Sequence, residues 1–465
     1  MSLLFIFLST ILLNSAQDNY IGNIYKDSSL ASSVYGVYIG YINGQKIFSS
    51  NENLNLVPGS SIKILTTALA LHTLGPEYRI KTELYYSGEI KENILYGDLI
   101  IKGYGDITLG SENFSSSIEK VEEDFTKAIN EVGIKKIKGN IIIDNSYYKY
   151  SSNGSWPWED IGNYYAAFPS PFSINDNSYK IYFKKTNKPG QKAEIENVIP
   201  DMDFKIKNEV ITGDKGSGDN SYIYSLPWSK EIKIIGSVPP GEFFIKGAMG
   251  NPSEFFLNHF KNYLISNRVA FEGNLLSVNE EINKKKLLKT FYSPTLKDIV
   301  KVIHAKSFNL YTEGLRNIIE KEKNDNFDKI MKNFLARYNL DYEKINLSDN
   351  CGLSRLNYIS AGYFFKFLDA INRDEYFDNF YSSLSYPRDT LLKGHLRNMD
   401  KNGALGDNLR IKSGSLKYVR SYVGYIKTKK NRLVGFSSIV NNYNCDPKSI
   451  DSLHEKIFVY IYENY

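Results

Sequence analysis

The sequence predicts an α+β protein in which one α/β domain is interrupted by a large, mostly β insert. Strand and helix patterns occur near the N-terminus and return after Pro294. Between them, many short β-like runs are separated by Gly, Asn, Asp and Pro. A chain of 465 residues also exceeds what one compact core usually holds. We therefore expect a discontinuous domain, 17–80 with 286–465, and an inserted domain or pair of domains, 81–285.

The first part of the chain predicts a hairpin followed by a helix. The β-like runs 34–41 and 45–48 flank Asn43-Gly44, which is the strongest short-range hairpin signal. Apolar residues then recur at helical spacing up to Leu74, and Gly75 follows. We expect this helix to begin near Ser60. The insert has strand-like runs at 95–101, 139–144, 178–184, 192–198, 206–212 and 231–235.

The last part of the chain predicts helices and a second set of strands. Amphipathic patterns at 296–304 and 310–320 predict helices. Two strands are expected at 421–426 and 433–440, and a final helix at 449–462.

Composition excludes several classes of protein. The chain is 42% hydrophobic and 23% charged, which is ordinary for a globular protein. Its net charge of +5 is small and dispersed, so we expect no nucleic-acid partner. Five scattered histidines and two cysteines lack zinc-ligand spacing, so we expect no metal. The sequence leaves open whether Cys351 and Cys445 form a disulfide.

Residues 1–16 resemble a secretory signal peptide. A short apolar run ends at Leu13, and Asn14, Ser15 and Ala16 supply small residues for cleavage, although no Lys or Arg precedes the run. The run is too short to span a membrane comfortably, and no later stretch is long and apolar enough. We therefore expect an exported protein without a stable membrane span.

Ser60 and Lys63 are the first candidate pair for chemistry. Residues three apart on a helix share a face, so the Lys63 amine can reach the Ser60 hydroxyl. A lysine kept neutral by desolvation or by nearby positive charge can accept the proton of a nucleophilic serine. The same Ser-x-x-Lys pattern also occurs from Ser117 to Lys120, so the motif alone is only a hypothesis.

Two further motifs follow downstream. Ser307-Phe308-Asn309 lies between two helix-like segments, and Lys412-Ser413-Gly414 starts a strand-like run. The order of the three motifs resembles the signature of penicillin-recognising serine enzymes. This resemblance implies a penicillin-binding or β-lactamase-like transpeptidase domain, an antiparallel sheet flanked by helices.

The long separation between Ser60 and Ser307 narrows the resemblance. A gap of this length resembles the gap that inserted domains create in the class C low-molecular-mass penicillin-binding proteins, the D-alanyl-D-alanine carboxypeptidase/endopeptidase family. Four other stretches resemble that family: 97–109, 156–165, 236–241 and 349–355. The sequence departs from the family pattern at Asn350, Cys351, Asp389 and Ser413.

The resemblance implies a role for each residue of the three motifs. Ser60 would attack the peptide carbonyl while Lys63 takes its proton. Ser307 would pass a proton to the leaving amine, and Asn309 would bind a substrate amide and steady Lys63. Lys412 would bind the terminal carboxylate and disfavour a proton on Lys63.

The resemblance also implies a set of substrate-binding groups. Ser413, Gly414 and Ser415 would bind the substrate, with the N–H groups of Ser60 and Ser415 forming the oxyanion hole. Asp160, Tyr165 and Arg355 match positions that line a pocket for the polar end of the stem-peptide side chain. Ordinary surface ion pairs or turn residues are the alternative for these last three.

The function implied is that of an exported, periplasmic serine D,D-peptidase, whose acyl-transfer mechanism needs no cofactor. Its substrates would be peptidoglycan stem peptides, and β-lactams would be covalent inhibitors. The alternatives are a β-lactamase or esterase on the same fold and a catalytically weak peptidoglycan-binding protein. The balance between carboxypeptidase and endopeptidase activity stays open, and so does the formation of a homo-oligomer.

Overall fold

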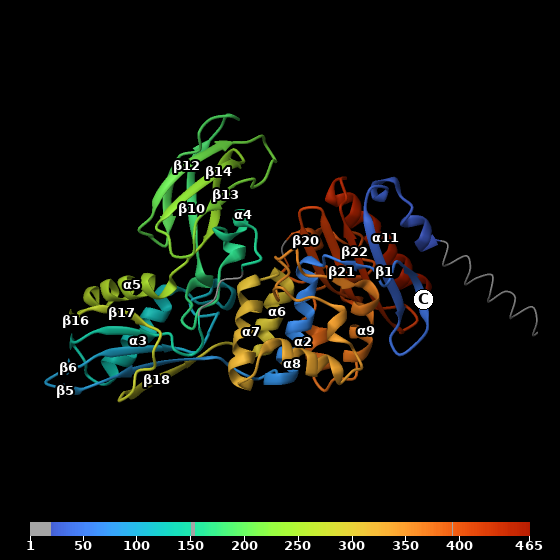
Figure 1. The fold of residues 1–465 in the computed structure, drawn as a ribbon. Helices are drawn as coiled ribbons and strands as arrows, with labels where there is room; N and C mark the ends of the chain where they lie inside the picture. Colours follow the sequence, from blue (N-terminus) through green and yellow to red (C-terminus); the bar gives the residue numbers. More distant parts are fainter. Residues whose placement is uncertain (1–19, 150–153, 393) are drawn as a thin grey trace, which may run out of the picture. The chain divides into compact units, whose positions relative to one another are not determined.

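The computed structural model describes residues 20–149, 154–392 and 394–465 (Figure 1). The signal peptide expected at 1–16 lies outside these residues. The chain forms two compact units. Unit 1 comprises Met1–Pro76, Val300–Ser307 and Asn326–Tyr465, and unit 2 comprises Glu77–Ile299 and Phe308–Asp325.

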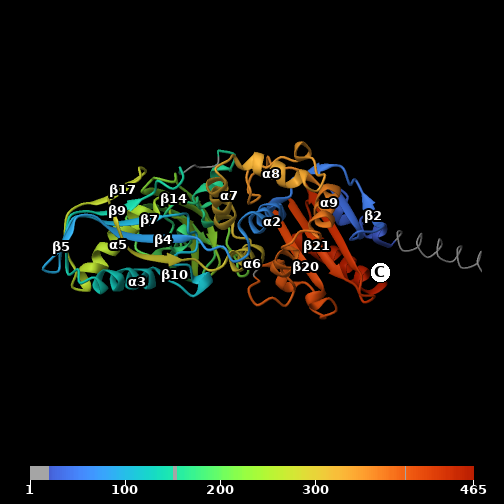
Figure 2. The same cartoon turned by 90° about the horizontal axis from the view of Figure 1, so that it is seen from below.

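Unit 1 is built on one five-stranded antiparallel sheet. Its strand order is β2-β1-β22-β21-β20, and every neighbouring pair is antiparallel. Figure 2 shows β20 and β21 side by side in this sheet. The strands are β1 (Val34–Tyr41), β2 (Lys46–Ser50), β20 (Leu409–Leu416), β21 (Val419–Lys427) and β22 (Leu433–Asn441). The predicted hairpin is confirmed, with Asn43 at a positive φ of 55° in its turn.

Helices cover both faces of this sheet, as the predicted fold class requires. The inner face of α11 (Pro447–Asn464) packs into a core with β1, β21 and β22. The helix α9 (Ala361–Ile371) packs on β1 and β21. Its Phe365 ring stacks on Tyr38 of β1, and one of its backbone carbonyls accepts a hydrogen bond from the Tyr425 hydroxyl of β21. The other helices of unit 1 are α2 (Lys63–Leu74), α8 (Phe327–Ala336), α10 (Phe377–Ser383) and the part of α6 (Leu296–Lys306) from Val300 onward.

The helix predicted to begin near Ser60 is α2 together with the 3₁₀ turn before it, η2 (Gly59–Ile62). All residues from Lys63 to Leu71 are buried, so α2 is surrounded by protein on every side. Gly75 ends the helix at a positive φ of 84°.

Unit 2 contains most of the strands, in four sheets. Figure 2 shows β4, β7 and β9 side by side in the five-stranded sheet β17-β9-β7-β4-β18. The other sheets are β16-β8-β6-β5, β11-β10-β15 and β12-β14-β13. The strands are β4 (Lys81–Tyr86), β5 (Glu89–Lys91), β6 (Ile94–Tyr96), β7 (Leu99–Gly103), β8 (Lys136–Lys138), β9 (Ile141–Asp144), β10 (Ser178–Thr186), β11 (Ile195–Ile199), β12 (Lys205–Thr212), β13 (Tyr222–Tyr224), β14 (Glu231–Val238), β15 (Gly241–Ala248), β16 (Ala270–Glu272), β17 (Leu275–Val278) and β18 (Lys286–Tyr292).

Unit 2 also contains helices and departs from the sequence expectation in detail. Its helices are α3 (Ile118–Glu131), α4 (Trp158–Ile161), α5 (Pro252–Ser266) and α7 (Asn309–Lys323). The single run expected at 95–101 forms two strands, which belong to two different sheets. Between them, the backbone N–H of Gly97 donates to the Lys138 carbonyl oxygen, and the Asp98 side chain accepts from the backbone N–H of Asn140. These two contacts lead the chain from one sheet to the next.

The boundary expected at 286 lies elsewhere in the structure. The strand β18 pairs with β4 along its length, so residues 286–292 belong to the same sheet as the start of the insert. Unit 2 accordingly extends to Ile299 and also takes in 308–325. Among the described residues, none of the helices has both the length and the apolar character needed to cross a membrane.

Truncating Phe458 should destabilise unit 1. Its ring is 1% exposed and packs against Phe436 and Tyr422. Phe458→Ala should lower the free energy of unfolding by about 3–5 kcal/mol, because a cavity remains. The measurement is urea unfolding followed by far-UV circular dichroism. Ser452→Ala, at an exposed position of the same helix, is the control, and equal stability of the two variants would contradict the packing described.

Candidate active site

Ser60 and Lys63 lie where the 3₁₀ turn η2 passes into α2. The Lys63 amine donates a hydrogen bond to Ser60 Oγ at 2.9 Å and another to the backbone carbonyl of Cys351. The side chain of Lys63 is completely buried. The structure therefore brings the first candidate pair together, with the lysine amine held between a hydroxyl and a carbonyl.

The turn that carries Ser60 is fixed to the central sheet. The Asn441 side chain on β22 accepts from the N–H of Val57 at 2.8 Å and donates to the carbonyl of Val57 at 3.0 Å. The hydroxyls of Ser61 and Ser421 lie 3.0 Å and 2.5 Å from the Pro58 carbonyl oxygen. These contacts hold the backbone before Ser60 against β21 and β22.

Two glycines allow other backbone segments to approach this turn. A Cβ at Gly414 on β20 would lie 2.2 Å from the carbonyl oxygen of Pro58, and one at Gly352 would lie 2.0 Å from that of Gly59. Any side chain at either position would displace the turn. The backbone nitrogen of Ser415 also lies against Gly59, 3.1 Å from the place of a Cβ there. This nitrogen is thus close to the start of η2, where Ser60 lies.

Lys412 and Ser307 form a second lysine–serine pair in unit 1. Lys412 Nζ donates to Ser307 Oγ at 3.0 Å and to the Ser413 carbonyl oxygen at 2.7 Å. Burial, and then the positive charge of Lys63, hold the pKa of the Lys412 amine well below its ordinary value. It therefore loses its proton at a lower pH than an exposed lysine. Ser307 itself has a φ of +57°, an unfavourable conformation for a residue with a side chain.

The carbonyl that contacts Lys63 belongs to a tightly bonded loop. Asp349 accepts hydrogen bonds from the backbone N–H of Gly352 and of Ser354, both at 2.6 Å, and from the Asn357 amide at 2.6 Å. Sequence reasoning did not assign Asp349 this positioning role, although it begins one of the family-like stretches. Cys351 contributes its backbone carbonyl to Lys63, so its departure from the family pattern leaves this contact intact. Cys351 and Cys445 are not joined in a disulfide.

His304 is a second residue whose position sequence reasoning missed. It lies three residues before Ser307, and its ring nitrogens contact Thr67 Oγ1 and Ser383 Oγ, each at 2.9 Å. Thr67 Oγ1 in turn donates to the Lys63 carbonyl oxygen. Burial, followed by the charge of Lys412, lowers the pKa of His304 to about 3, so the ring is neutral near pH 7. His304 therefore connects α6 to α2 through Thr67, close in sequence to Ser307 and Lys63.

The remaining candidates are divided between the units. In unit 2, Asn309 begins α7 and donates to the Tyr165 carbonyl oxygen at 2.7 Å, and the Tyr165 hydroxyl donates to Asp160 at 3.0 Å. In unit 1, Arg355 is exposed and donates to the Lys417 carbonyl oxygen at 3.1 Å. The structure thus joins Asn309, Tyr165 and Asp160, and the pocket expected from Asp160 with Arg355 stays a prediction.

The alternative Ser-x-x-Lys match has a structural role. Ser117 precedes α3, and its hydroxyl accepts the backbone N–H of Lys120 at 3.2 Å, which makes it the helix N-cap. The Lys120 amine pairs with Glu123 and Asp124 on the surface. This second match is therefore a capped, exposed helix start.

Known proteins with a similar sequence or fold point to one family. The model of the D-Ala-D-Ala carboxypeptidase 3 (S13) family matches residues 17–457. The D-alanyl-D-alanine carboxypeptidase DacB of Haemophilus influenzae is 22% identical over 435 residues, which cover 88% of this chain and 86% of that protein. A D-alanyl-D-alanine carboxypeptidase of Actinomadura is 23% identical over 443 residues, which cover 91% and 80%.

Solved structures agree on the fold. The crystal structure of penicillin binding protein 4 (dacB) from Haemophilus influenzae has a TM-score of 0.80 at 20% identity and covers 95% of this chain and 99% of that one. A second crystal structure of the same protein, complexed with a novel β-lactam, has a TM-score of 0.76. The predicted fold class is confirmed. Since the family model spans nearly the whole chain, this protein belongs to the D-Ala-D-Ala carboxypeptidase 3 (S13) family and is a penicillin-binding serine D,D-peptidase, as the sequence resemblance predicted.

Proposed function

We propose that Ser60 is the acylated nucleophile of this enzyme and that Lys63 is its general base. The observation that carries the proposal is the 2.9 Å hydrogen bond between the completely buried Lys63 amine and Ser60 Oγ. Burial and the nearby Lys412 amine both disfavour a positive charge on Lys63, which leaves its lone pair available for the Ser60 proton.

In the proposed reaction, Ser60 Oγ attacks the carbonyl carbon of the penultimate D-alanine as Lys63 accepts its proton. The backbone N–H groups of Ser60 and Ser415 would stabilise the oxyanion. The C–N bond then breaks, and a proton passes through Ser307 to the leaving amine. Water hydrolyses the ester, which releases the shortened peptide and restores the Ser60 hydroxyl.

Lys412 has two roles in this proposal. Its amine, with the Ser413 hydroxyl, would bind the terminal carboxylate of the substrate, and its contact with Ser307 Oγ at 3.0 Å would orient that hydroxyl toward the leaving group. Gly414 would let β20 approach η2 closely enough for the substrate to align with the strand. Asn309 would bind a substrate amide. Asp160, Tyr165 and Arg355 would bind the polar end of the stem-peptide side chain.

The substrates we propose are peptidoglycan stem peptides, at D-Ala-D-Ala termini and at D,D-cross-links. Both reactions break the same kind of bond and differ only in the leaving amine. β-Lactams would acylate Ser60 because they present a strained amide to the same nucleophile, and the β-lactam complex of the Haemophilus protein supports this. We place the enzyme in the periplasm, after removal of residues 1–16.

The first test is the site of acylation. Wild-type protein incubated with a fluorescent penicillin should carry one adduct on the peptide containing Ser60, located by mass spectrometry. Ser60→Ala should abolish it. Ser117→Ala, which changes the other Ser-x-x-Lys match, should leave labelling unchanged. An adduct elsewhere would overturn the proposal, and rapid loss of the adduct would favour a β-lactamase instead.

The second test concerns the charge of Lys412. Lys412→Met removes a positive charge next to Lys63, so the pKa of Lys63 should rise. The acidic limb of the pH profile for penicillin acylation should then move to higher pH, by about one unit for each ~1.4 kcal/mol of repulsion removed. The rate at the optimum should also fall by about 100-fold, because Ser307 loses its partner. Lys412→Arg keeps the charge and should leave the limb in place. An unmoved limb in Lys412→Met would contradict the role of this charge.

The third test concerns the loop that holds Lys63. Gly352→Ala should reduce the acylation rate at least about tenfold, because its Cβ would lie 2.0 Å from the Gly59 carbonyl oxygen and φ there is +81°. Cys351→Ser should stay within about twofold of wild type, because Cys351 contacts Lys63 through its backbone carbonyl. The measurement is stopped-flow acylation by a chromogenic cephalosporin. The reverse order of effects would contradict the described site.

A further inference from the structure

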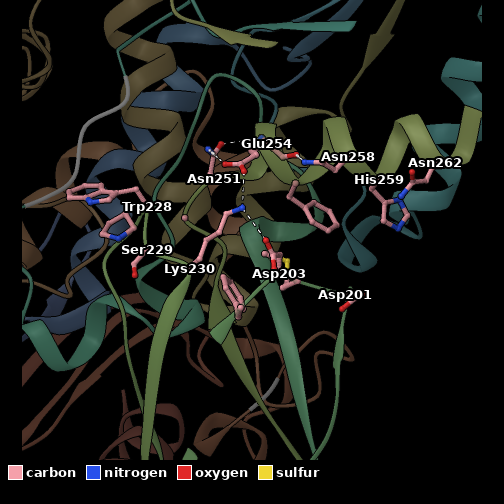
Figure 3. A pocket seen from close by; sticks show the side chains of 15 residues that line it. Asp201, Asp203, Trp228, Ser229, Lys230, Asn251, Glu254, Asn258, His259 and Asn262 are labelled. Carbon is pink, nitrogen blue, oxygen red and sulfur yellow. Dashed lines mark hydrogen bonds and ion pairs between the residues drawn. The ribbon is translucent and has the colours of Figure 1, made fainter. Parts of the chain in front are cut away.

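Unit 2 contains a cavity that none of the catalytic residues lines. Its volume is about 710 Å³, within the range of small-molecule sites. Three segments form it: the residues leading into β12, the residues leading into β14, and one face of α5. Figure 3 shows Trp228 at one end, Asn258, His259 and Asn262 toward the other, and Lys230 between them.

The centre of the cavity is polar, and its lining has more carboxylates than lysines. Lys230 Nζ pairs with Asp203 and with Glu254, each at 3.2 Å, so the one lysine faces two carboxylates (Figure 3). Asp201 adds a third carboxylate to the lining, and His259 is directed to Glu122 at 2.7 Å. The lining therefore has no excess of positive charge, which disfavours a phosphate, a polyanion or an acidic peptide as its ligand.

The side chains at the two ends suit a sugar. The Trp228 indole is 69% exposed and offers a flat apolar face, on which the C–H face of a pyranose ring can pack. Asn258 and Asn262 lie four residues apart on α5 and so share a face of the helix. Asn258 Nδ2 already donates to the Glu254 carbonyl oxygen at 2.9 Å. Its second amide hydrogen and its oxygen, with the amide of Asn262, can donate to and accept from hydroxyl and N-acetyl groups. An aromatic plane beside amides and carboxylates matches a neutral ligand that is rich in hydroxyls.

We propose that this cavity binds the glycan strand of peptidoglycan, as a short run of N-acetylated amino sugars. The inference rests on the proposed function, which makes peptidoglycan the substrate polymer. Binding the glycan would hold many stem peptides near the enzyme. Their effective concentration at Ser60 would therefore rise. The cavity would then increase activity on the polymer without changing activity on a free peptide.

Binding is tested with chitotetraose, the neutral tetramer of N-acetylglucosamine. In Trp158→Phe protein, Trp228 is the exposed indole, since Trp156 is only 5% exposed. Chitotetraose should change its fluorescence emission in a saturable manner. Calorimetry should show at least a tenfold weaker interaction for Trp228→Ala and for Asn258→Ala/Asn262→Ala. Tyr292→Ala, which removes a ring that is 64% exposed and lies outside the cavity, is the matched control and should bind as wild type does.

The functional arm compares two substrates. Trp228→Ala should release D-alanine from a soluble pentapeptide at the wild-type rate but act on intact sacculi at least fivefold more slowly. Equal activity of both proteins on sacculi, or no saturable chitotetraose binding, would overturn the glycan site. Wild-type protein that binds chitotetraose but cleaves neither substrate would instead overturn the proposed function and leave the glycan site standing.

Discussion

The candidate active site in unit 1 depends on two buried lysine amines, each hydrogen-bonded to a serine hydroxyl. Lys63 contacts Ser60 and Lys412 contacts Ser307, and the two amines repel each other when both are protonated. Removing two like charges from water is costly, so the site favours states in which at most one of them is charged. A neutral lysine amine next to a serine hydroxyl can accept the proton of that hydroxyl. The surrounding contacts hold the two amines in place.

Those contacts are made largely by the backbone and by neutral side chains. The Cys351 carbonyl, held by the Asp349 loop, contacts Lys63 without adding a charge that would stabilise its protonated form. His304 stays neutral for the same reason that Lys412 has a low pKa, because burial and neighbouring cations oppose a further positive charge. It can therefore tie α2 to α6 through hydrogen bonds alone.

Local pattern predicted some of this arrangement, and the rest depends on contacts distant in sequence. The Ser60–Lys63 contact follows from a three-residue spacing on a helix, and the hairpin at Asn43 follows from its turn residues. The Ser307–Lys412 contact joins residues 105 positions apart, which no periodicity reveals. The family resemblance assigned both residues to one site but did not predict this contact. The helix α5 was missed among strand-like runs, although Asn251 at its N-cap and Pro252 after it are typical start signals. The sequence placed a domain boundary at 286, where β18 begins. Because β18 pairs with a strand about 200 residues earlier, it belongs to unit 2.

The departures from the family pattern leave the lysine–serine contacts in place. Cys351 contacts Lys63 through its carbonyl, and Asn350 accepts a hydrogen bond from Thr66 on α2. Asp389 accepts the backbone N–H of Leu391 at 2.9 Å, a turn contact that a short polar side chain makes locally. Ser413 retains a hydroxyl beside Lys412. The positions with no room for a side chain are different, such as Gly414 against Pro58, because a change there would move the turn that carries Ser60. The geometry of this site therefore depends on close backbone approach and on the two amines more than on the residues around its edge.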